Sequence, residues 1–94
     1  MITRVTWDPG KRDANLSLRG FDFAFASLVF QGPTLERRDD RREYGEDRVI
    51  AVGEADGFLL WVVYTDRPTP GGVERRIISA RRSNQRERQA YQDR

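Results

Sequence analysis

The sequence has no cysteine and no histidine among its 94 residues, and its only lysine is Lys11. The lack of cysteine excludes disulfides and thiol chemistry, and without histidine the usual ligands of a structural zinc site are missing as well. No apolar run approaches the roughly 18 residues of a membrane-spanning helix, and the N-terminus does not resemble a signal peptide. We therefore expect a cytoplasmic protein that has no membrane anchor, metal or cofactor.

Arginine is abundant, and it is unevenly distributed. The formal net charge of the chain is only +2, but residues 67–94 carry eight arginines against three acidic residues, whereas residues 1–66 have a net charge of −3. A guanidinium group matches phosphate oxygens with a planar fork of donors and stays charged at any relevant pH. A solvated, exposed face is the plainer interpretation of such a cluster. The length of 94 residues predicts a single domain over residues 1–94.

The first third of the chain predicts one strand and two helices. Residues 3–7 are prone to form a strand, and Asp8-Pro9 places a capping acid before a first-turn proline. The first helix should run from there to about Arg19 and end at Gly20, which readily adopts the left-handed conformation. Asp22 then caps a second segment of about ten residues with helical spacing of its apolar side chains.

The remainder of the chain predicts strands and a final helix. Gly32-Pro33 ends the second helix, and the charged residues 35–48 suggest a solvated loop with a short edge strand. Residues 58–65 form an almost unbroken β-branched and aromatic run, typical of a central strand buried on both faces. The other expected elements are a strand at 49–53, a hairpin turn at 54–57, a reversal at 67–73, a strand at 74–80 and a helix capped by Ser83.

The resulting order, β–α–α–β–β–β–α, predicts an α+β fold with a small antiparallel sheet covered by helices. One face of the sheet should stay open beside the basic segment. Side chains alternate along a strand, so Arg76 and Arg81 would point to opposite faces of a regular strand. The two can converge on one basic surface with Arg67 only if the strand ends or bulges near Ala80.

Several short motifs follow one another along the chain: WDPGK at residues 7–11, Asn15-Leu16, Gly20, VF at 29–30, GEDR at 45–48, VVYTDR at 62–67, RIISARR at 76–82, Glu87-Arg88 and Tyr91. In content and order they resemble the BrnT family of toxins from bacterial type II toxin–antitoxin systems. The resemblance implies a RelE-like fold and cleavage of RNA without a metal. It also implies a BrnA-type antitoxin with a ribbon-helix-helix module, so that DNA would be contacted only through that partner.

If a ribose 2′-OH attacks the adjacent phosphate, the site needs a base, a proton donor and cations around the phosphorane. Arginines cannot deprotonate, so they are candidates for holding phosphate. The candidate catalytic residues are Lys11, Glu46, Arg67, Arg76, Arg81 and Tyr91. The candidate phosphate-binding residues are Arg19, Arg48, Arg82, Arg86 and Arg88. The plainer interpretations are an exposed Lys11, a Glu46 paired with Arg48, and a Tyr91 packed on the sheet.

The chain departs from the family pattern at one place. Family members usually have Lys-His-Gly where this chain has Leu18-Arg19-Gly20. If the histidine transfers a proton, Arg19 cannot replace it, and the chain is then an attenuated homologue that mainly binds the antitoxin in an autorepressing DNA complex. If the position only contacts phosphate, Arg19 serves equally well. A third interpretation is a general RNA-binding domain, in which Trp7, Tyr44 and Trp61 stack on bases.

Overall fold

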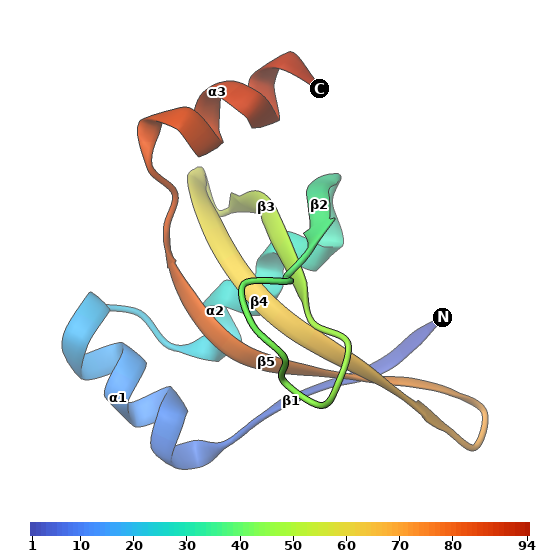
Figure 1. The fold of residues 1–94 in the computed structure, drawn as a ribbon. Coiled ribbons are helices and arrows are strands. Elements are labelled where there is room, and N and C mark those ends of the chain that lie inside the picture. Colours follow the sequence, from blue (N-terminus) through green and yellow to red (C-terminus); the bar gives the residue numbers. More distant parts are fainter.

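The computed structural model describes all residues, 1–94, as one α+β unit (Figure 1). Nine elements follow one another along the chain. They are β1 (Ile2–Trp7), α1 (Pro9–Arg19), α2 (Phe23–Ala26), the 3-10 helix η1 (Ser27–Gln31), β2 (Thr34–Arg38), β3 (Val49–Ala55), β4 (Phe58–Thr69), β5 (Gly72–Arg82) and α3 (Gln85–Asp93). The expected fold class is confirmed, although four strands rather than three follow the first helices, because the edge strand β2 is a full member of the sheet.

The sheet is mixed, which corrects the prediction of an antiparallel sheet. Its strand order is β1-β5-β4-β3-β2, and neighbouring strands are antiparallel except for β1, which pairs with β5 in parallel. Parallel pairing of the first and last strands requires a long connection rather than a hairpin, and everything between β1 and β5 provides it. Sequence patterns reveal hairpins between neighbours but not pairings between distant segments.

The first helix forms as predicted. The Asp8 carboxylate accepts a hydrogen bond from the Lys11 amide, Pro9 occupies the first turn, and Gly20 ends the helix with φ at 83°. The predicted second helix is shorter than expected. Its α-helical part has four residues, and the chain then tightens into the five-residue η1. The Asp22 carboxylate caps α2 by accepting from the Phe25 amide.

Two tight turns define the hairpins of the sheet. Asp56 and Gly57 both have positive φ, of 50° and 88°, as a two-residue type I′ turn between β3 and β4 requires. The second turn is shorter than the predicted reversal at 67–73, because β4 continues to Thr69 and β5 resumes at Gly72. Pro70 and Gly71, with φ of 85° at the glycine, suffice for the reversal.

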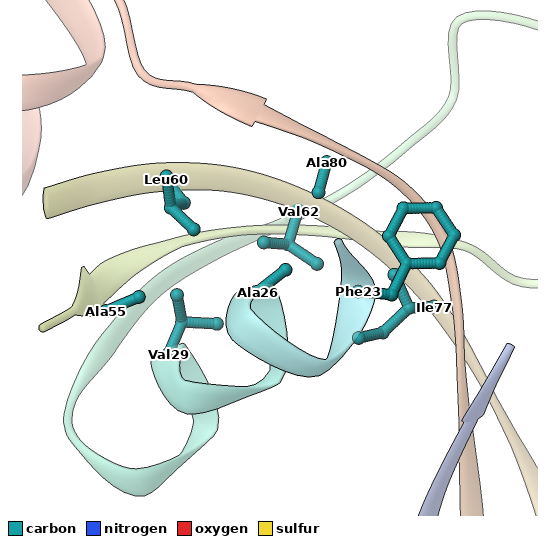
Figure 2. Close-up of a cluster of buried hydrophobic side chains, with 8 residues drawn as sticks. All are labelled: Phe23, Ala26, Val29, Ala55, Leu60, Val62, Ile77 and Ala80. Carbon is teal, nitrogen blue, oxygen red and sulfur yellow. The ribbon is translucent and has the colours of Figure 1, made fainter. Parts of the chain in front are cut away.

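Alternate residues of the central strand β4 point into two separate cores. Leu60 and Val62 belong to a cluster on the face covered by the short helices, and Figure 2 shows the side chains of α2 and η1 packed against that face. Trp61 and Val63 belong to a second cluster on the opposite face, which includes Tyr91 of α3. Residues 60–65 are all buried, so the prediction of a strand buried on both faces is confirmed for that part of β4.

The C-terminal helix α3 begins one residue later than predicted. Its N-cap is Asn84, which forms a reciprocal capping box with Glu87. Ser83 is buried instead, and its hydroxyl donates to the Leu59 carbonyl, so it fastens the end of β5 to β4. The helix lies at the end of the molecule opposite the β4–β5 turn (Figure 1). It therefore covers only part of its sheet face, which here is called the α3 face.

Candidate functional site

A bulge in β5 brings separated residues of the basic segment to the same face of the sheet. Val63 of β4 pairs with Ser79, but the next residue, Tyr64, pairs with Ile77, so Ile78 is an extra residue in β5. The register places Arg76, Ser79 and Arg81 opposite Thr65, Val63 and Trp61, all on the α3 face. Regular alternation would point Arg76 and Arg81 to opposite faces, and the extra residue restores them to the same face. The bulge lies at Ile78, two residues before the position near Ala80 where it was expected.

Helix α1 runs beside this bulge and adds two cations. Lys11 and Arg19 line a shallow pocket of about 180 Å³ together with Ser79. Neither cation forms an ion pair, and Arg76 has none either. Arg76 and Ser79 face β4 residues two positions apart, which corresponds to about 7 Å along the strand. The bulge and α1 thus place Lys11 and Arg19 in a pocket with Ser79 and Arg76 on the sheet face of Ser79, all three cations without a carboxylate partner.

Arg81 is held rigidly on the same face. Its guanidinium carbon lies 4.1 Å from the centroid of the Trp61 ring, and its two terminal nitrogens donate to the Glu87 carboxylate at 2.9 and 2.8 Å. These hydrogen bonds from Arg81, with the Asn84 amide, hold the pKa of the Glu87 carboxyl below its usual value. A phosphate that binds Arg81 must therefore compete with Glu87 or share the guanidinium with it.

A third group of charges belongs to the loop between β2 and β3. Glu46 accepts a hydrogen bond from Arg48 at 2.9 Å and lies 3.9 Å from Arg67. The Thr65 hydroxyl donates to the Asp47 carbonyl at 2.7 Å, which fastens the loop to β4 at the residue opposite Arg76. The structure thus brings Glu46, Arg48 and Arg67 together, with Glu46 in the ion pair that the plainer interpretation predicts.

The same loop is stabilised by a buried carboxylate. The side chain of Asp39 is fully buried and accepts two hydrogen bonds from Arg41, at 2.7 and 2.8 Å. Hydrogen bonding to Arg41 lowers the pKa of Asp39 to about 2. Arg41 in turn lies 5.2 Å from the centroid of the Trp61 ring, so Trp61 carries two guanidinium groups. Sequence reasoning missed Arg41, because the charged run around it has no periodicity.

The remaining candidates lie elsewhere. Tyr91 is buried, its hydroxyl donates to the Pro33 carbonyl at 3.0 Å, and it lies near Glu54, at the other end of β3 from Glu46. Arg86 is exposed on α3, and Arg88 donates to the Ser83 carbonyl. Arg82 pairs with Leu60 and so points to the opposite face of the sheet. The surface that converges is therefore smaller than the predicted set.

Ser79 is the residue of this surface that sequence reasoning did not single out. It lies inside the RIISAR motif, of which only the arginines were candidate site residues. The bulge places Ser79 on the same sheet face as Arg76 and Arg81, and no propensity scale detects such a bulge. Trp61 and Trp7, suggested as stacking residues, are buried or half-buried in the two cores, and Tyr44 lies 4.1 Å from the guanidinium carbon of Arg48.

A family model described as the ribonuclease toxin BrnT of type II toxin–antitoxin systems matches residues 7–87. The chain belongs to this family. As a member of the BrnT family it is the toxin component of a type II pair, and membership implies an antitoxin as its partner. A search of curated proteins gave no match. None of the helices has the length and apolar character needed to cross a bilayer, and no three acidic side chains lie close enough together to hold a metal ion.

Proposed function

We propose that this BrnT toxin cleaves RNA without a metal, by attack of a ribose 2′-OH on the adjacent phosphate. The observation that carries the proposal is a set of three cations without ion-pair partners: Lys11 and Arg19 line a pocket with Ser79, and Arg76 lies on the same sheet face as Ser79. A phosphate bound there replaces water around these cations and meets preorganised positive charge. Such charge stabilises the phosphorane more than the ground state.

Each group has a role in the proposed reaction. Glu46 takes the proton of the 2′-OH, and the bond from that oxygen to phosphorus forms as the bond to the 5′ oxygen breaks. Lys11 donates a proton to the leaving 5′ oxygen, which gives a 2′,3′-cyclic phosphate and a free 5′-OH. Arg76 and Arg81 hold the phosphate oxygens during the reaction. Tyr91 is left out of this scheme, because its hydroxyl is bound to the Pro33 carbonyl.

The test is cleavage of total RNA by the purified chain in excess chelator. We expect cleavage to persist, Glu46→Gln to slow it by about 10²–10⁴-fold, and Arg76→Gln by about 10²–10³-fold. Arg94→Gln is the matched control, since Arg94 lies at the C-terminus, outside the residues that match the family model. A parent protein that is inert in chelator and active with added metal would contradict the proposed chemistry.

The second candidate function is that of an attenuated homologue that acts mainly through its antitoxin. The observation that favours it is Arg19, which lines the pocket of Lys11 but cannot carry a proton. In this case the partner is a BrnA-type antitoxin whose ribbon-helix-helix module binds operator DNA, and the toxin contacts DNA only through it. A RelE-like classification of the fold is part of the same proposal and rests on the α+β sheet with α3 on one face.

A further inference from the structure

Phe58 is an aromatic residue that the sheet leaves uncovered. It begins β4 directly after the Asp56-Gly57 turn, and it is 44% exposed although the following strand residues are buried. The Phe25 ring contacts its edge, with ring centroids 6.3 Å apart. The guanidinium carbon of Arg82 lies 4.8 Å from the centroid of the Phe58 ring. A guanidinium group thus lies over an exposed aromatic ring at the surface.

This pair borders a hollow of about 470 Å³ on the helix-covered face of the sheet. Its lining is completed by Leu16, Arg19, Gly20, Phe21, Asp22, Phe25 and Leu60. Asp22 is the only acidic residue among these, and its carboxylate is already engaged, since it accepts hydrogen bonds from Arg12 and from the Phe25 amide. Arg82 and Arg19 have no ion-pair partner, so the rim of the hollow carries unpaired positive charge.

The hollow and the pocket of the proposed cleavage site share one lining residue. Arg19 lines both this hollow and the pocket that contains Lys11 and Ser79. Ser79 and Arg82 are three residues apart on β5, which corresponds to about 10 Å along the strand, and they point to opposite faces of the sheet. A single RNA strand that places a phosphate at Ser79 therefore reaches Phe58 only by passing Arg19, which lines both hollows.

We propose that the Phe58–Arg82 pair is a base-stacking subsite for single-stranded RNA beside the cleavage site. The inference rests on the proposed function, because it assigns a second contact to the same substrate. Aromatic rings and guanidinium planes are the groups on which proteins stack unpaired bases, and flanking cations hold the backbone. Charge complementarity calls for an anionic occupant, because unpaired Arg19 and Arg82 flank the ring, and the guanidinium over an exposed aromatic ring favours the flat bases of RNA over peptide side chains.

The alternative occupant is an apolar, acidic segment of the antitoxin. The shape of the side chain at position 58 distinguishes this occupant from RNA. A base needs a flat π face at position 58, whereas a peptide side chain needs only apolar volume. Phe58→Leu removes the face and keeps much of the volume, and Phe58→Trp keeps the face. Arg82→Lys keeps the charge and removes the plane. Since Phe58 and Arg82 are both exposed, the variants should fold, which thermal melting checks.

The experiment measures the binding of two single-stranded 2′-O-methyl oligonucleotides, one with bases and one with the same backbone but no bases. The methyl group blocks the attacking hydroxyl, so binding is measured without cleavage. We expect Phe58→Leu and Arg82→Lys to weaken binding of the base-bearing chain by about 5–100-fold, as the loss of one stacked base predicts. Both variants should leave the abasic chain unaffected, Phe58→Trp should bind like the parent, and Arg94→Gln is the charge control.

Equal affinity of the parent and Phe58→Leu for the base-bearing oligonucleotide would overturn the inference. So would a result in which Phe58→Asp abolishes antitoxin binding while all position-58 variants bind RNA alike, since the hollow is then a protein-docking surface. The proposed function fails differently, through a parent that does not cleave RNA in chelator. A parent that cleaves RNA but shows no dependence on Phe58 would leave the function standing and refute only the subsite.

Discussion

Replacing Trp61 by alanine should be among the most damaging single changes in this protein. Trp61 is 6% exposed and packs with Ile50, Val52, Val63 and Tyr91 in the core under α3. Removing a buried tryptophan ring costs about 3–5 kcal/mol in lost transfer energy and in the cavity left behind. Since a domain of this size has a free energy of unfolding of about 5–15 kcal/mol, the variant loses a large part of its stability.

The ring also supports Arg81, and this contribution can be measured separately. An aromatic ring under a guanidinium contributes about 0.5–2 kcal/mol at such distances. A double-mutant cycle of Trp61→Leu and Arg81→Met isolates that coupling from the loss of the Glu87 ion pair, which both Arg81→Met variants share. The ring of Trp61 borders a cavity of about 280 Å³ between α3 and the sheet, so the alanine variant enlarges an existing space.

The assay is urea unfolding followed by thermal melting. A loss of 3 kcal/mol corresponds to a drop in Tm of at least about 12 °C for a chain of this length. A loss below about 1 kcal/mol for Trp61→Ala would show that the core under α3 does not depend on the ring. A coupling energy of zero in the double-mutant cycle would refute the placement of Trp61 as the platform for Arg81.

Three further changes test other parts of the structure. Folding lowers the pKa of Glu87, so its ion pair with Arg81 stabilises the fold fully above the unfolded pKa of about 4.3. This stability is lost as the pH falls through the lower pKa of the folded state. Glu87→Gln should therefore flatten that part of the curve of unfolding free energy against pH. Gly72→Ala places its Cβ 2.1 Å from the Thr3 methyl and should cost about 1–3 kcal/mol, most of which Thr3→Ala should restore; no loss would show that the edge relaxes freely. If the chain is attenuated because Arg19 cannot carry a proton, Arg19→His should raise the single-turnover cleavage rate between about pH 6 and 8.5. A lower rate throughout, with weaker binding of uncleavable RNA, would show that Arg19 works by holding phosphate.

Local sequence signals determined the parts of this fold that depend on neighbours along the chain. Asp8 and Pro9 define the start of α1, and Gly20 defines its end, because capping and left-handed backbone are local properties. The apolar run in β4 predicted a buried central strand for the same reason. The Asp56-Gly57 turn fixes the β3–β4 hairpin through backbone conformation alone. The motifs that carry the BrnT resemblance are likewise readable in order along the chain.

Other features depend on contacts between distant segments, and only the tertiary structure decided them. The parallel pairing of β1 with β5 joins residues about 70 positions apart, and the sequence of neither strand indicates which strand it pairs with. The short α2 and η1 follow from packing on the sheet, and Asn84 rather than Ser83 caps α3 because Ser83 binds the Leu59 carbonyl.

The candidate site shows the same division. The sequence identified Lys11, Arg76 and Arg81 as candidate catalytic residues. The alternation of side chains along a strand showed that a bulge was needed for the two arginines to share a face. Where β5 admits the extra residue depends on its pairing with β4, so the bulge at Ile78 and the role of Ser79 appear only when the strands are side by side. Residue types set which groups can hold phosphate, and register decides which of them meet.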